Sequence, residues 1–197
     1  MKKIFYAFLL FLQCSFAQNE EKAEKKLSFK PDFSINAIIP FHSGTNYLAD
    51  AAKSNFALGI HLNFLKYNNF LLGMGFDYVN YSITDVSKGG DLGGRNLRSI
   101  YGRLGYRQSI IKKLEINPYV GMGYANLNSS KMRYGKQEGI DYRIGANINY
   151  KLNQHLAPFI GVCYLQSKFK VNGAAPEYVS YFDHSKMLQL IVGLNIN

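Results

Sequence analysis

Cysteine is scarce in this sequence, which holds only Cys14 and Cys163 among 197 residues. We expect Cys14 to leave with an export signal, so the mature chain keeps one cysteine and cannot form an internal disulfide. The four histidines lack the short spacings of a zinc site; they are His42, His61, His155 and His184. We therefore predict no metal and no cofactor, and stability must come from the fold itself.

The sequence also lacks an apolar run that would span a membrane as a helix. The N-terminal run, Ile4 to Leu12, is far shorter than the roughly 20 residues that a spanning helix needs. It follows two lysines and precedes small residues, the layout of a secretory signal. We predict that residues 1–17 are a signal peptide, cleaved after Ala17. A lipoprotein signal is the alternative, but Gln13 before Cys14 replaces the small residue that lipoprotein processing normally needs.

Acidic residues are few, at 13 against 23 lysines and arginines, which gives a formal net charge of +10. Removing the signal, with its two lysines and no acid, leaves about +8. We place most of these cations in connections: Lys53, Lys88, Arg95, Lys131, Arg133, Lys136, Lys168, Lys170 and Lys186. Such a field favours acidic surface ligands, lipid phosphates and lipopolysaccharide. Solvated loops that keep the protein soluble during transit are the simpler explanation and are preferred to a dedicated anion site. Export and the lack of a binding motif argue against nucleic acid as a partner.

What the chain does have is one alternation of apolar and polar residues, repeated about eight times. Because side chains on a strand point alternately to opposite faces, each segment has an apolar and a polar face. We predict an all-β fold, an eight-stranded antiparallel up-and-down transmembrane β-barrel, over residues 29–197, after a flexible periplasmic leader at 18–28. The predicted strands are 29 to 41, 55 to 65, 70 to 82, 97 to 110, 117 to 127, 139 to 150, 156 to 169 and 186 to 197.

The polar phase indicates which face is inside. It consists of Gly, Asn, Asp, Arg, Tyr and Ser with little Lys, which suits a crowded lumen better than a solvated surface. We predict a lumen charge network in which arginines pair with carboxylates: Asp77, Arg103, Arg107, Asp141 and Arg143. We predict that the apolar phase faces lipid, including Phe56, Leu58, Ile60, Leu62, Phe64, Leu188, Leu190, Val192 and Leu194. A secreted lipocalin-like barrel with inverted faces is the alternative.

Short connections alternate with longer ones rich in Gly, Ser, Asn, Lys and Asp, near 42 to 54, 83 to 96, 128 to 138 and 170 to 185. Bacterial outer-membrane barrels have short periplasmic turns and longer outside loops. Both chain ends are therefore expected to face the periplasm, with the protein in the cell outer membrane.

Three segments carry a resemblance to a known family: Asn117 to Tyr124, Ala157 to Tyr164, and the closing Leu188 to Asn197. Over residues 29–197 the chain resembles small outer-membrane barrels of the OmpA and OmpX type, in particular the porin-like barrel domains common in Bacteroidetes. The resemblance implies contact with the barrel-insertion machinery and implies no catalytic set. One departure is the final Asn197, because such barrels usually end on an aromatic residue.

The best candidate for enzyme chemistry is Asp183, His184 and Ser185, and His42 with Ser43 is a weaker one. A histidine beside a serine can serve acyl transfer on lipid, but adjacent residues of a strand point to opposite faces and do not readily share a proton. We therefore expect a non-catalytic barrel with a structural, adhesive or surface-interaction role. A narrow, porin-like solute channel is the first alternative, and a lipid-modifying hydrolase is the second.

Overall fold

The computed structural model describes residues 27–29, 31–89, 93–129, 137–171 and 176–196. Eight long strands form the barrel: β2 (Asp32–Ser43), β3 (Ala52–Tyr67), β4 (Phe70–Ile83), β5 (Arg95–Tyr106), β7 (Leu114–Ser129), β8 (Gln137–Tyr150), β9 (Leu156–Lys170) and β10 (His184–Ile196). The smaller elements are β1 (Leu27–Ser28), β6 (Gln108–Ile111), α2 (Tyr47–Ala51), α3 (Val86–Gly89) and α4 (Pro176–Phe182). The predicted signal peptide, and the leader as far as residue 26, lie outside the described residues.

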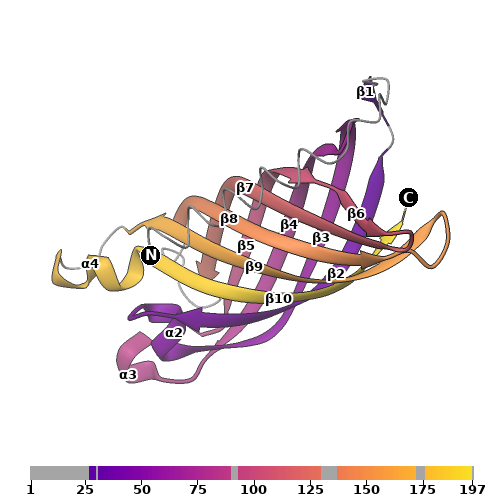
Figure 1. Ribbon diagram of the computed structural model, residues 1–197. Helices are drawn as coiled ribbons and strands as arrows, with labels where there is room; N and C mark the ends of the chain where they lie inside the picture. The colour runs from indigo at the N-terminus through magenta and orange to yellow at the C-terminus, as the bar shows by residue number, and fades with distance from the viewer. Residues whose placement is uncertain (1–26, 30, 90–92, 130–136, 172–175, 197) are drawn as a thin grey trace, which may run out of the picture.

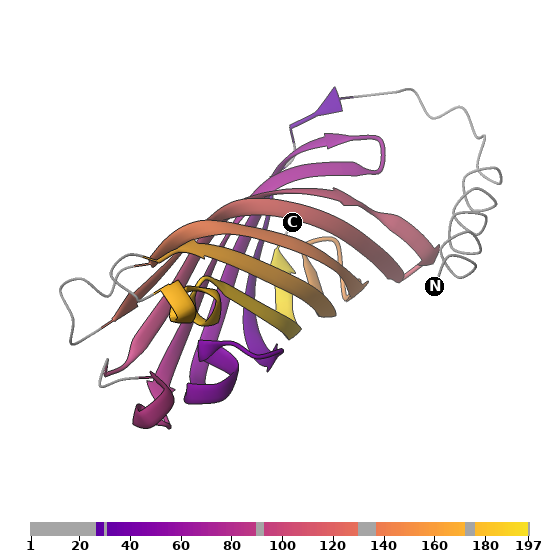
Figure 2. The ribbon, with the colours of Figure 1, turned by 90° about the vertical axis from the view of Figure 1, so that its left-hand side faces the viewer.

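The sheet closes on itself. Each long strand pairs antiparallel with its neighbours in the chain, and β2 pairs with β10 from Phe33 opposite Ile196 to Ser43 opposite Lys186. The prediction of a closed, eight-stranded, up-and-down barrel is confirmed. Figures 1 and 2 show the three short helices at one end of the barrel and the strand-connecting turns with the C-terminus at the other. We call these the helical end and the turn end.

The strand predicted at 97 to 110 is interrupted at Arg107, between β5 and β6. Opposite this break lies Pro118, inside β7 and not at its start as predicted. Pairing stops at Gly105 with Tyr119 and resumes at Gln108 with Ile116. Proline has no backbone N–H to donate, so the ladder fails at this point.

Strands β2 and β3 pair only from Asp32 to Ala37 and separate toward the helical end. Pro40, which lacks an N–H, lies in the separated part of β2. The connection between the two strands contains α2, which begins after Asn46. The Asn46 side-chain oxygen accepts a hydrogen bond from the Ala49 N–H at 3.1 Å, a typical N-cap.

Two further differences from the sequence prediction concern the connections. Leu27 and Ser28, assigned to the leader, form β1 and pair with Tyr67 and Lys66 of β3. Three of the long connections also contain a short helix where only a loop was expected. Among the described residues, no helix combines the length and the apolar character needed to cross a membrane.

Candidate functional site: the lumen and its rims

The outer surface of the barrel carries the apolar phase. Most of the residues predicted to face lipid are exposed, for example Leu58 at 51% and Val192 at 50%. Leu62, Phe64 and Leu190 are half-buried, and Phe64 lies at an irregularity in the pairing of β3 with β4. Other strands add exposed apolar side chains, including Ile35, Met74, Ile100, Val120, Ile144 and Val162. An apolar surface that runs around a closed barrel matches what lipid requires.

The centre of the lumen holds a buried ion-pair network around Arg143. Its guanidinium donates to an Asp77 oxygen at 2.6 Å and to an Asp141 oxygen at 2.7 Å. It also donates to the Ser99 hydroxyl at 2.8 Å, and that hydroxyl donates to Asp141. The Arg143 side chain is 1% exposed, so both carboxylates neutralise a charge that water cannot reach.

Two aromatic rings complete this network. The Arg143 guanidinium carbon lies 3.3 Å from the centre of the Tyr101 ring. The Tyr101 hydroxyl lies 2.6 Å from His61 Nε2 and donates to Asp77 at 3.2 Å. The sequence excludes His61 from a zinc site and predicts no other role for it, whereas the barrel places it inside the network. Its position in the polar phase of β3 was the available signal.

Of the two other residues predicted for the network, Arg103 joins it through His61, and Arg107 lies elsewhere. Arg103 contacts His61 Nδ1 at 3.2 Å and stacks on the Tyr119 ring at 4.1 Å. Arg107 lies further toward the turn end, where it pairs with Asp32 at 2.7 Å. The prediction that Arg107 pairs with Asp77 or Asp141 is therefore wrong, because the break after β5 carries Arg107 out of the central layer.

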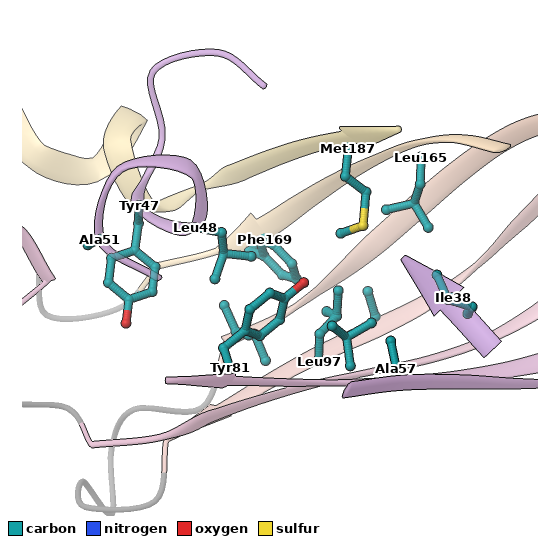
Figure 3. Close-up of a cluster of buried hydrophobic side chains, with 13 residues drawn as sticks. Ile38, Tyr47, Leu48, Ala51, Ala57, Tyr81, Leu97, Leu165, Phe169 and Met187 are labelled. Atoms are coloured by element: carbon teal, nitrogen blue, oxygen red, sulfur yellow. The ribbon is translucent and has the colours of Figure 1, made fainter. Parts of the chain in front are cut away.

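The helical end of the lumen is apolar, which the sequence did not predict. Tyr47, Leu48 and Ala51 of α2 turn into the barrel and meet inward side chains of the surrounding strands (Figure 3). Those strand residues are Ile38, Ala57, Val79, Tyr81, Leu97, Ala125, Leu127, Leu165, Phe169 and Met187. We call this cluster the apolar plug. The signal in the sequence was an apolar residue such as Val79 or Leu97 in the otherwise polar phase near a strand end.

Arg95 borders the plug. The sequence assigned it to a loop, but it begins β5 and is 1% exposed, with its guanidinium carbon 5.0 Å from the Tyr47 ring centre. The same guanidinium donates to Gln137 at 3.2 Å. Burial raises the pKa of the Tyr47 phenol, so this hydroxyl is neutral at neutral pH.

The geometry at Asp183, His184 and Ser185 follows the strand alternation. His184 Nδ1 lies 2.8 Å from an Asp183 oxygen, and both side chains are partly exposed. Ser185 is fully buried in the lumen. His184 and Ser185 therefore point to opposite sides of the barrel wall. In this arrangement the histidine is not placed to accept the proton of the serine hydroxyl.

Three lysines gather on the outer surface of β9 and β10, near the helical end: Lys168, Lys170 and Lys186. Lys168 stands between Ile140 and His184 in the strand register, and Lys170 stands opposite Glu138. All three lysines are exposed. Toward the barrel centre, the next outward residue on β10 is Leu188, and on β9 Gln166 is followed by Tyr164. The lysines therefore lie at the edge of the apolar surface. The basic residues Lys131, Arg133 and Lys136 lie outside the described residues.

No protein-family model matches the chain, and no curated protein matches it significantly. Several solved structures are similar to the chain in fold. Neisserial surface protein A superposes with a TM-score of 0.60 at 13% identity, covering 87% of this chain and 99% of that chain. The fold is that of the outer-membrane β-barrels. The barrel domain of Pseudomonas aeruginosa OprF (TM-score 0.44, 15% identity, 85% and 99% covered) and Yersinia pestis Ail (0.43, 14%, 88% and 99%) are also similar. The narrower resemblance to the OmpA and OmpX type stays a prediction.

Proposed function

We propose that the protein is a non-catalytic outer-membrane barrel that acts at the cell surface through structural or adhesive contacts and conducts no solutes. The observation that carries this proposal is the filled lumen. The apolar plug occupies its helical end, and the Arg143 network occupies its centre. An interior of eight strands is just wide enough for side chains to fill it. The narrow channel is therefore the weaker alternative.

The orientation follows the rule that outer-membrane barrels keep short turns in the periplasm and longer loops outside. The turn end, with both described chain ends, then faces the periplasm, and the helical end faces the outside. This assignment places Lys168, Lys170 and Lys186 at the level of the outer-leaflet headgroups.

We infer that these three lysines bind the phosphates of lipopolysaccharide. Exposed lysines beside anionic lipid contribute roughly 1 kcal/mol each to the interaction. The exposed Ile140 opposite Lys168 and the exposed Leu188, the next outward residue after Lys186, support this partner, because a headgroup phosphate lies where the apolar surface ends. Glu138 opposite Lys170 offsets part of the charge.

The membrane location is tested by the gel mobility of protein extracted from the outer-membrane fraction, with and without boiling. A folded membrane barrel resists the detergent and shifts on boiling. Soluble protein without a shift would mean that the assignment of the two faces is reversed and that the apolar side chains line the interior. In planar bilayers we expect no conductance steps from heat-shifting protein, and regular steps would establish the channel instead.

The lipopolysaccharide contact is tested with Lys168→Gln, Lys170→Gln and Lys186→Gln combined. In detergent, added lipopolysaccharide should stabilise the unchanged protein more than this triple variant, and dephosphorylated lipopolysaccharide should act equally on both. Lys53→Gln, Lys88→Gln and Arg98→Gln combined is the matched control, since it removes the same charge from exposed positions outside the three-lysine group. Equal stabilisation of all three proteins would refute the contact.

The hydrolase alternative has its own test. Ser185→Ala should leave the lipid profile of the outer membrane unchanged, because the Ser185 hydroxyl is buried on the side of the wall away from His184. Loss of a lipid product in that variant, with folding intact, would establish catalysis.

A further inference from the structure

The turn end of the lumen opens into a cavity of about 550 Å³. Five cations line it: Lys66, Arg107, Lys112, Lys113 and Lys151. A volume of this size is within the range of small-molecule sites. The cavity is separate from the apolar plug and the Arg143 network, and the surface role proposed above makes no use of it.

Backbone contacts between the turns bring these cations together. The Lys151 N–H donates to the Lys113 carbonyl at 2.8 Å, which joins the β8–β9 turn to the β6–β7 turn. The Arg107 N–H donates to the Asn69 carbonyl at 2.7 Å, which joins the break after β5 to the β3–β4 turn. Lys66 comes from β3, next to that turn. The cations are thus held by connected backbone.

Two of the five cations already have carboxylate partners. Arg107 pairs with Asp32 at 2.7 Å, and Asn63 donates to the same carboxylate at 2.5 Å. Lys151 pairs with Glu115 at 2.6 Å. These pairs fix the rim of the cavity and leave their own charges balanced.

The other three cations carry the charge excess. Within the part of the chain that the structure describes, Lys66, Lys112 and Lys113 form no ion pair. Lys66 is half-buried, so it does not simply extend into water. The buried Arg107 Nε also has no hydrogen-bond partner in the described part. The cavity thus presents three unpaired cations and a directional donor.

We propose that this cavity binds a phosphate group that carries an organic substituent. Lysine is a common point-charge ligand of phosphate, and a guanidinium adds a directed N–H. Three unpaired cations suit an anion of one to two negative charges, and the remaining volume, beside Leu152, holds the substituent. In the proposed orientation the cavity opens at the inner leaflet, so the phosphate belongs either to a lipid headgroup or to a soluble periplasmic ester.

The test compares three folded proteins in zwitterionic detergent. They are the unchanged chain, the combined variant Lys66→Gln, Lys112→Gln and Lys113→Gln, and a control that removes three exposed cations outside both proposed sites, Lys53→Gln, Lys88→Gln and Arg98→Gln. Two probes distinguish the sources, glycerol 3-phosphate as the soluble ester and phosphatidylglycerol against phosphatidylcholine as the lipid. Binding is followed by calorimetry and by the amide NMR shifts of Lys151 and Arg107. The boiling shift confirms that each variant folds.

We expect the variant at the turn end to bind about tenfold or more weakly than the unchanged chain, while the control keeps full affinity. Binding of glycerol 3-phosphate identifies a soluble ester, and binding of phosphatidylglycerol alone identifies a lipid headgroup. The proposal is overturned if neither probe binds, or if both triple variants lose affinity equally. The lipopolysaccharide test is independent, because the three lysines that it changes do not line this cavity.

Discussion

Arg143 donates to Asp77 across the lumen at 2.6 Å, and the two residues come from strands that are not neighbours in the sheet. A contact of this kind ties opposite sides of the barrel wall together without a backbone hydrogen bond. With Asp141 as a second partner, the arginine is outnumbered by carboxylates inside the network. Of the residues in the network, Arg143 is therefore the one whose replacement should lower the stability of the barrel most.

We predict that Arg143→Met lowers the free energy of unfolding by about 3 to 5 kcal/mol, because it leaves Asp77 and Asp141 buried without their common cation. Urea unfolding in lipid vesicles measures the change. Adding Asp77→Asn to this variant should recover part of the loss, since one unpaired charge is then removed.

Arg98→Met is the matched control for this prediction. Arg98 is exposed on the outer wall, with its guanidinium carbon 5.9 Å from the Tyr78 ring centre. We expect a change below about 1 kcal/mol for this variant. Equal losses at Arg143 and Arg98 would show that the central network does not stabilise the barrel.

A second prediction concerns two glycines on opposite faces of the wall. A Cβ at Gly145 would lie 2.6 Å from the Val162 carbonyl oxygen and 2.7 Å from Tyr119 Cζ, whereas a Cβ at Gly102 would have no atom within 4 Å. Gly145→Ala should destabilise by about 1 to 3 kcal/mol through overcrowding. Gly102→Ala should be neutral or slightly stabilising, because alanine limits the unfolded chain more. Equal effects on the urea midpoint would contradict the crowding of the lumen.

Most of the fold was predicted from the alternation of apolar and polar residues, because this pattern is set by neighbouring residues of the chain. Each residue of β9 faces the side opposite its neighbour, so the face of Val162 or Cys163 can be assigned from the chain alone. The number of strands follows from the count of such segments. The antiparallel direction of the strands and the closure of the barrel follow from that even number. The break at Arg107 was not predictable in this way, because it depends on Pro118 arriving opposite it from another strand.

The contents of the lumen were harder to predict because they depend on the stagger between strands. The residue types of the charge network were predicted from the polar phase, yet Arg107 and Asp32 are 75 residues apart and meet only in the closed barrel. The apolar plug was missed for the same reason. Leu48 belongs to a connection, and nothing local indicates that it turns into the barrel.

The assignment of faces gives a labelling prediction at two adjacent residues. Cys163 is 1% exposed and points inward, while Val162 is 49% exposed and points outward. In a Cys14→Ser background, a membrane-soluble maleimide should leave Cys163 unlabelled until the protein is boiled. Val162→Cys combined with Cys163→Ser should react in the folded state. The reverse pattern would mean that the apolar phase lines the interior.

The last prediction tests whether α2 is held by the apolar plug. Leu48 is 2% exposed among the inward side chains of the plug, so Leu48→Ala removes contacts worth about 2 to 4 kcal/mol. Because α2 is a single short helix, we expect this loss to appear as local opening, with faster hydrogen exchange of the Ala49 amide and little change in the strand amides. Val86→Ala, an exposed position of α3, should leave the Ala49 rate unchanged. Conductance should remain absent in the Leu48 variant, because Arg143 and its partners still fill the centre; current through this variant alone would show that the plug is the only barrier in the lumen.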